Sequence, residues 1–217
     1  SMSDTGQPST RDEPARSSDD HAELLSELEA HDLAHALETV QADDRSAFAF
    51  DPDADPEETF PQSVASGGPT PTGVILWTRI APEAFDEGES LAVEVSTDDS
   101  FEETVYSAVL RQPERIAAHD HTVKIDLDGH LDPDTEYAYR FVYDGVRSRV
   151  GRCQTMPYEE SSPESVSCAV LTCQKYLNGY FPALHHVAEE DVDFIVHLGD
   201  FIYESDSGDF KGLGPYD

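Results

Sequence analysis

The feature that most constrains the fold is a series of short strand-like segments with no long helix between them. Six segments of alternating or apolar residues are bounded by turn-forming residues, and they span residues 74–80, 91–96, 104–110, 121–127, 136–143 and 149–154. Val123, Ile125 and Leu127 alternate strictly with polar residues, as in a strand with one buried face. The spacing is typical of a sandwich, so it predicts one antiparallel β-sandwich over residues 60–157.

One turn within this region is more specific. The stretch from Leu131 to Tyr139, LDPDTEYAY, resembles the turn-then-tyrosine segment of fibronectin type III-like domains. In those domains a proline rigidifies the turn and a tyrosine hydroxyl bonds back to the chain. The resemblance favours a fibronectin III/Ig-like sandwich, in which the single tryptophan, Trp77, is most simply a core residue.

The pattern changes after Met156. Residues 166–171 form an apolar run bounded by polar residues, residues 180–190 have helical spacing, and residues 194–198 are again apolar. Strand, helix and strand in about 35 residues predict one βαβ unit, so residues 164–217 are expected to begin an α/β domain. Two parallel strands and one helix do not bury a core, and further sheet must come from elsewhere.

The first 59 residues carry weaker signals. Residues 1–19 are polar without periodicity and are predicted to be disordered. A helix is predicted from about Asp20 to Val40, followed by an acidic, proline-broken linker at residues 51–59. His31 and His35 have the i, i+4 spacing of a metal-binding pair. Because no third ligand is suggested nearby, exposed histidines on a helix are the simpler interpretation.

The chain is very acidic, with 46 Asp and Glu against 13 Lys and Arg and a formal charge of −33. Residues 1–60 hold 17 acidic and three basic residues, so most of the charge lies in the expected folded part. Self-repulsion at such a charge disfavours the compact state, and molar salt would screen it. The composition therefore favours adaptation to a salt-rich, halophilic setting; the alternative is an acidic tail alone.

This charge also bears on partners. It argues against nucleic acid and anionic membranes, since both are bound through Lys and Arg. An anionic substrate would be repelled unless a metal ion supplied local positive charge. No segment reaches the roughly 18 apolar residues of a membrane span, and no signal peptide is visible. Three cysteines, Cys153, Cys168 and Cys173, do not form a disulfide framework; Cys168 is expected in the core.

Candidate functional residues follow both strands of the βαβ unit. Cys173 comes after the first, and Asp200 and Tyr203 come after the second. Functional groups of α/β sheets collect beyond the carboxyl ends of strands. Thiolate and phenolate suit a trivalent or soft metal, and a carboxylate can bridge two ions. The alternatives are an inert strand-end thiol, a turn-forming aspartate and a tyrosine of the rim, while His197 is expected to be a core histidine.

Two sequence blocks resemble a known family. HLGDFIY, from His197 to Tyr203, resembles the GDxxY block of metallophosphatases related to purple acid phosphatases. The longer stretch from Thr172 through this block resembles the PhoD-like alkaline phosphatase family, and residues 60–80, FPQSVASGGPTPTGVILWTRI, resemble the opening of that family's β-sandwich. The resemblance covers residues 60–217; Gly68 stands where the family commonly has Asp.

The resemblance implies a fold, an activity and a set of metals. It implies a metallophosphoesterase domain after the sandwich, with hydrolysis of phosphate mono- and diesters at an extracellular or cell-surface location. It implies a site of Fe³⁺ and Ca²⁺, in which Cys173 and Tyr203 bind iron and Asp200 bridges the two metals. Asp200 is thereby the candidate catalytic residue. The substrate partner is a phosphate ester.

The family's later ligand blocks do not occur in this sequence, so the chain is expected to be an incomplete or inactive fragment. Its unpaired parallel strands predict self-association through an exposed sheet edge. One alternative is a non-catalytic Ig-like binding module with the βαβ segment as decoration. Another is a metal hydrolase that uses Asp200 without iron.

Overall fold

The computed structural model describes residue 26 and residues 31–40, 45–162, 165–175, 181–201 and 203. The chain divides into two compact units, Ser1–Met156 and Pro157–Asp217, called here unit 1 and unit 2. The segment predicted to be disordered, residues 1–19, lies outside the described residues.

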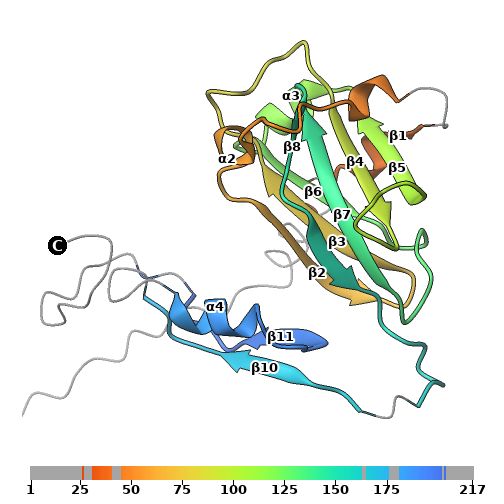
Figure 1. The fold of residues 1–217 in the computed structure, drawn as a ribbon, viewed down its shortest axis with the longest axis vertical. Coiled ribbons are helices and arrows are strands. Elements are labelled where there is room, and N and C mark those ends of the chain that lie inside the picture. The colour runs from red at the N-terminus through yellow and green to blue at the C-terminus, as the bar shows by residue number, and fades with distance from the viewer. Residues whose placement is uncertain are drawn as a thin grey trace, which may run out of the picture. The chain divides into compact units, whose positions relative to one another are not determined.

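Unit 1 is built from antiparallel strands in two sheets (Figure 1). Its strands are β1 (Leu37–Thr39), β2 (Val64–Thr70), β3 (Gly73–Arg79), β4 (Leu91–Ser96), β5 (Thr104–Leu110), β6 (Thr122–Asp126), β7 (Glu136–Tyr143), β8 (Val146–Arg147) and β9 (Gly151–Gln154). The larger sheet has the order β1-β5-β4-β7-β8, with β9 also paired to β7, and the smaller has the order β2-β3-β6. All six segments predicted as strands are present, with ends shifted by at most two residues.

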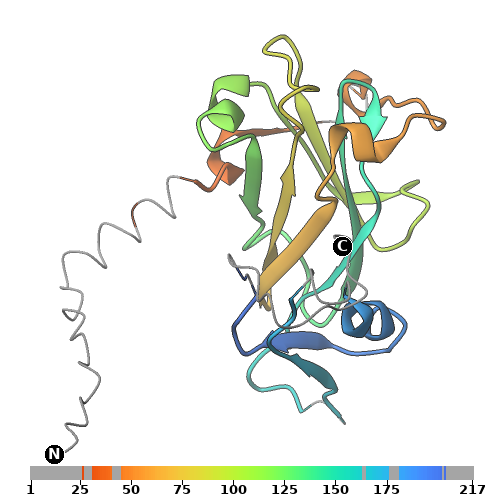
Figure 2. The same cartoon turned by 90° about the vertical axis from the view of Figure 1, so that its left-hand side faces the viewer.

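The core of unit 1 lies between the two sheets, which form separate layers (Figure 1, Figure 2). One buried cluster joins Leu76 and Ile125 of the smaller sheet to Val93 and Phe141 of the larger. The prediction that Trp77 is a core residue is wrong, since its side chain is only half-buried. Successive side chains of a strand point to opposite faces, so the neighbour of buried Leu76 must point outward.

Strand β2 was not predicted. Its sequence VASGGPT contains two glycines and a proline, which indicate a turn rather than a strand. The strand nevertheless pairs with β3, and its register shifts between Gly67 and Thr70. Gly68 has φ of +56°, a conformation that glycine adopts readily. Pairing with a regular neighbour therefore overrides the local turn signal.

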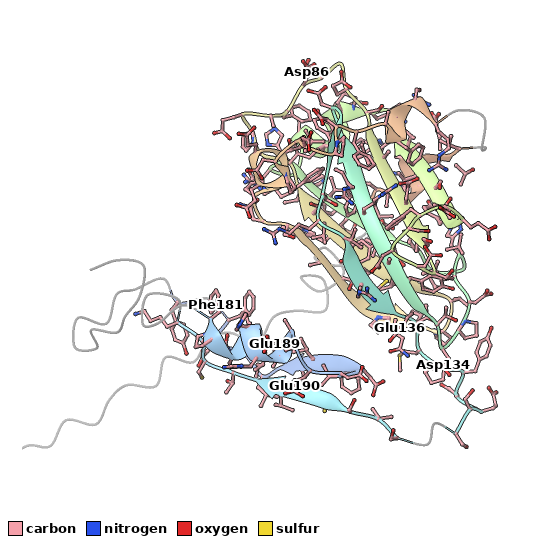
Figure 3. All side chains as sticks on the ribbon, in the orientation of Figure 1. Asp86, Asp134, Glu136, Phe181, Glu189 and Glu190 are labelled. Carbon is pink, nitrogen blue, oxygen red and sulfur yellow. The ribbon has the colours of Figure 1, made fainter. Side chains whose placement is uncertain are left out.

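Two tyrosine hydroxyls fix loops of unit 1 to its strands. Tyr137 accepts a hydrogen bond from the backbone N–H of Asp132 at 2.9 Å, which is the contact that the turn-then-tyrosine pattern predicts. Tyr143 donates to the backbone carbonyl of Asp86 at 2.7 Å and accepts from its N–H at 2.9 Å. Asp86 lies in the loop between β3 and β4 (Figure 3). Strand β7 therefore anchors the turn that precedes it through Tyr137 and the β3–β4 loop through Tyr143.

The helix predicted through Val40 is wrong over its second half. After His31 the chain forms a short 3-10 turn, η1 (Ala34–Ala36), and then strand β1, which pairs antiparallel with β5. Leu33 is 1% exposed within the sandwich core, and its N–H donates to the carbonyl of Lys124 in β6. The segment thus contacts β6, an edge strand of the smaller sheet, and adds β1 to the edge of the larger sheet. Burial of Leu33 and pairing to β5 override the helical spacing, because propensity is weaker than tertiary packing.

His31 and His35 consequently do not share a helix face. His31 lies 2.9 Å from the Thr122 hydroxyl, and its ring stacks on that of His119 with centroids 4.3 Å apart. His35 is exposed and contacts Arg115. Burial, together with the neighbouring His119 and Lys124, lowers the pKa of His31 against an opposing effect of Asp32.

We expect this histidine to make unit 1 less stable in mild acid. The unfolded chain binds a proton at the ordinary pKa of 6.5, above that of folded His31. Stability is therefore fully present above pH 6.5 and is lost as the pH falls through 6.5 toward the folded pKa. Urea unfolding above and below pH 6.5 measures the free energy of unfolding. Its decrease at the lower pH should be smaller in His31→Gln than in the wild type, with His35→Gln as the exposed control. Equal pH dependence in all three proteins would contradict this expectation.

A second buried cluster lies on the outer face of the larger sheet. The turn η2 (Ser46–Phe48) places Phe48 against Ala92, Val109 and Val142. The following residues, predicted as a linker, include the helix α2 (Pro56–Thr59) and end at buried Thr59. The linker prediction is thus wrong for this end of the segment, because a helical turn capped by Asp55 forms there and the carbonyl of Thr59 accepts a hydrogen bond from the N–H of Ala81. Helix α3 (Pro113–Ala117) carries Arg115.

Unit 2 has the predicted order of strand, helix and strand. β10 (Cys168–Leu171) pairs in parallel with β11 (Phe194–His197), and α4 (Pro182–Val187) connects them (Figure 1). Figure 3 shows Phe181 at the start of α4 and Glu189 beyond its end. The predictions of a buried first strand and a core Cys168 are wrong, since Cys168 and Val170 are exposed. Two strands and one short helix provide too little cover to bury both faces of the pair.

Candidate metal centre

The site begins where the two parallel strands of unit 2 end. Parallel pairing of Leu171 with His197 puts the carboxyl ends of β10 and β11 side by side. Beyond them the backbone N–H of Leu198 donates to the carbonyl of Leu171 at 2.8 Å, and the N–H of Cys173 donates to the carbonyl of Gly199 at 3.3 Å. The two loops that carry the candidate residues are therefore joined through their backbones.

Cys173 and Asp200 meet across this junction. The Cys173 sulfur lies 3.1 Å from Oδ2 of Asp200, within hydrogen-bonding distance of the thiol. Both residues have positive φ, 54° and 53°, and Gly199 between the strand and Asp200 has φ of 109°. Residues with a side chain seldom adopt this conformation, and the strain is typical of functional sites. The tight turns bring a thiol and a carboxyl group together at the edge of the sheet.

Tyr203 is the third group at this edge. Its phenol lies close to Cys173 and Asp200, and its side chain is 38% exposed. Hydrogen bonding to Cys173, with desolvation and the negative charge of Asp200, raises the pKa of Tyr203 to about 12. The phenol is therefore neutral at physiological pH. All three residues predicted as metal ligands lie in one cluster.

Two further residues contact this cluster and were not predicted to do so. The Thr172 hydroxyl lies 3.2 Å from the Cys173 sulfur and 3.4 Å from the carbonyl of Gly199. Nδ1 of His197 accepts a weak hydrogen bond from the N–H of Gly199 at 3.3 Å. His197, predicted to be a core histidine, is half-buried instead. The only sequence signal for Thr172 is a hydroxyl beside the candidate thiol.

The donor set suits one of the two implied metals better than the other. A thiolate and a phenolate are appropriate ligands for iron in its ferric state. Ca²⁺ takes six to eight oxygen ligands, toward which Asp200 provides a single carboxylate. Across the described residues there is no cluster of three or more His, Cys, Asp or Glu side chains that could hold a metal. The three residues fit an iron ion in part, and a calcium ion requires additional ligands.

In the part of the chain that the structure describes, no helix is both long enough and apolar enough to cross a membrane.

Comparisons with known proteins give consistent matches on both units. The family described as "PhoD-like phosphatase, N-terminal domain" matches residues 45–157, and the family described as "PhoD-like phosphatase" matches residues 168–215. The chain is similar to "Alkaline phosphatase D" of Bacillus subtilis (strain 168), with 35% identity over 169 residues, or 74% of this chain. A solved structure titled "Structure of PhoD" aligns with 70% of the chain at a TM-score of 0.60 and 33% identity.

The chain covers only part of these relatives. It spans 28% of the length of the Bacillus phosphatase and 30% of the solved PhoD chain. A fibronectin type III domain of human origin also aligns, at 15% identity and a TM-score of 0.33, which is too low to bear on the fold.

Proposed function

Since this chain belongs to the PhoD-like phosphatase family, we propose that it carries the first metal ligands of a metal-dependent hydrolase of phosphate mono- and diesters. One observation carries the proposal. A thiol, a carboxyl group and a phenol converge from two strand ends. The sulfur of Cys173 lies 3.1 Å from Oδ2 of Asp200, and the phenol of Tyr203 interacts with both residues.

The proposed roles follow from the chemistry of the three side chains. Cys173 and Tyr203 would hold Fe³⁺ through sulfur and phenolate oxygen, and Asp200 would be shared with Ca²⁺. Both the thiol and the phenol must lose a proton to bind a metal, so loading releases protons. When bound, the two metals supply positive charge to the phosphoryl oxygens and activate a water molecule for attack on phosphorus.

The charge of the chain makes local positive charge necessary. A phosphate ester is anionic, and a protein of formal charge −33 repels it. Asp200 places one of these negative charges at the site itself. Substrate binding therefore depends on cations held by these side chains, which is why loss of a ligand should impair both metal retention and catalysis.

Because the chain spans less than a third of the length of the Bacillus phosphatase and of the solved PhoD chain, we propose that the described cluster is a partial site. Additional oxygen ligands would complete it, and turnover by the 217-residue chain alone should be low or absent. Location outside the cytoplasm is also proposed, with family membership as its support.

Iron loading of the 217-residue chain tests the proposal. We expect the chain reconstituted with Fe³⁺ to show a visible phenolate-to-iron absorption band, which Tyr203→Phe removes. Cys173→Ala should retain iron at least about tenfold less tightly, because even the loss of a residue that only orients a ligand typically lowers metal affinity about 10- to 100-fold. Absorption spectra and iron content after dialysis measure the two effects. Hydrolysis of a chromogenic phosphodiester in molar salt, with Ca²⁺ and Fe³⁺ present, measures any activity.

Cys168→Ala is the matched control, since Cys168 is an exposed thiol at the other end of the same strand. It should bind iron as the wild type does. Equal iron retention by Cys173→Ala and the wild type, or an unchanged band in Tyr203→Phe, would refute the proposed ligand set.

A further inference from the structure

We infer that Thr172 is a positioning residue that holds the Cys173 sulfur against Asp200 by tying the loop after β10 to the loop after β11. The inference rests on the proposed function, because it assigns a residue that supports the same metal site. Thr172 itself is not proposed as a ligand or as a catalytic residue.

The first support is the place of the Thr172 hydroxyl. Its oxygen lies 3.2 Å from the sulfur of Cys173 on its own loop and 3.4 Å from the carbonyl of Gly199 on the opposite loop. A threonine hydroxyl has one proton and two lone pairs. Its proton is donated to the Gly199 carbonyl, which can only accept, and this bond links the two loops. The Cys173 thiol donates to Asp200, so the Thr172 oxygen is a close neighbour of the sulfur on its own loop.

The second support is the backbone strain at Cys173 and Asp200, on either side of this link. Cys173 and Asp200 both have positive φ, a conformation that persists only where surrounding contacts enforce it. The Gly199 carbonyl next to Asp200 accepts from the N–H of Cys173 at 3.3 Å and from the Thr172 hydroxyl at 3.4 Å. The hydroxyl is thus one of the two contacts to this carbonyl that hold the strained turns together.

The third support is the exposure of the residues involved. Thr172, Cys173 and Asp200 are all exposed, so packing against a core does not fix the orientation of their side chains. Their relative geometry depends on these few hydrogen bonds. Residues that orient metal ligands in this way commonly change metal affinity 10- to 100-fold when they are removed.

The test compares Thr172→Val, which has nearly the same shape without the hydroxyl, with Thr172→Ser, which keeps the hydroxyl. The probe is Co²⁺ titrated into the 217-residue chain, because a cobalt–thiolate bond gives a charge-transfer band that reports on Cys173 directly. We expect Thr172→Val to lower Co²⁺ affinity by about 10- to 100-fold and to shift that band. Thr172→Ser should restore the affinity and band position of the wild type.

Amide hydrogen exchange checks the fold of the variants. Protection of the Leu198 N–H, which bonds to Leu171, reports whether β10 and β11 remain joined. If Thr172→Val loses this protection, the Co²⁺ affinity and band position of Thr172→Ala are compared with those of Thr172→Ser instead. Wild-type affinity and an unshifted band in a valine or alanine variant with intact Leu198 protection would overturn the inference, as would failure of serine to rescue.

Cys173→Ala separates this inference from the proposed function. If Cys173→Ala binds Co²⁺ with the wild-type affinity and band, the proposed ligand set fails, and the role of Thr172 fails with it. If Cys173→Ala loses the band while Thr172→Val behaves as the wild type, the ligand set stands and only the positioning role is refuted.

Discussion

Arg140→Met is expected to lower the free energy of unfolding of unit 1 by about 3 kcal/mol, because it removes a partner from a buried carboxylate. Glu94 is 0% exposed in the middle of the larger sheet, and it accepts a hydrogen bond from Nε of Arg140 at 2.7 Å. Arg45 also pairs with Glu94, so the loss should fall at the lower end of the range for a broken buried pair.

The surroundings of Arg140 strengthen this expectation. Its guanidinium lies 4.1 Å from the ring centroid of Phe101 and 5.1 Å from that of Phe50. Cations over aromatic faces gain further energy when they are shielded from water. Methionine retains part of the apolar contact with both rings, so the variant removes the ion pair and the cation–π contacts together while leaving much of the packing.

Urea unfolding measures the effect, and two variants control it. Arg149→Met breaks an exposed pair with Glu57 and should cost no more than about 1 kcal/mol. The double variant Glu94→Met with Arg140→Met should recover most of the loss, because an apolar pair of similar volume leaves no buried charge. If Arg140→Met and Arg149→Met cost the same, the buried pair has no special role.

Leu33→Ala is expected to have the second large effect, lowering the free energy of unfolding of unit 1 by about 2–5 kcal/mol. Leu33 is 1% exposed and belongs to the main core cluster, so its truncation leaves a cavity between the sheets. A leucine that faces solvent would behave differently, since its truncation leaves no cavity. The size of the loss therefore measures how far residues 31–40 belong to the sandwich core.

The matched control for Leu33→Ala is Val105→Ala. Val105 is an apolar residue of β5 that is 48% exposed, so its truncation should change the free energy of unfolding by about 0.5 kcal/mol or less. Urea denaturation of the two variants and the wild type makes the comparison. A loss below 1 kcal/mol for Leu33→Ala would mean that residues 31–40 contribute little to the sandwich.

Sequence reasoning and structure agree best where a pattern reports on a regular surface. The alternation of Val123, Ile125 and Leu127 identified β6, because every second side chain of a strand enters the core. The strand-like segments 91–96, 104–110 and 136–143 likewise identified β4, β5 and β7 with their observed bounds. The same reasoning missed β2, whose glycines and proline indicate a turn when the pairing partner is unknown.

The candidate site divides in the same way. Cys173, Asp200 and Tyr203 were predicted from residue type, motif and the rule that parallel strands present groups at one edge. Their contacts require more than the motif. The partner of the Thr172 hydroxyl is a carbonyl 27 residues away, and only the register of Leu171 opposite His197 brings the two together.

The sequence by itself therefore determined the strands of the sandwich, the βαβ order and the identity of the candidate ligands, because each depends on local periodicity or on neighbouring residue types. Tertiary structure alone decided that residues 31–40 join the sheets, that Trp77 points outward and that Thr172 lies between Cys173 and Gly199. Each of these depends on which distant segment a residue meets. Burial of Leu33 and the pairing of β1 with β5 outweigh a helical preference of a few tenths of a kcal/mol per residue, and local sequence carries no record of that partner.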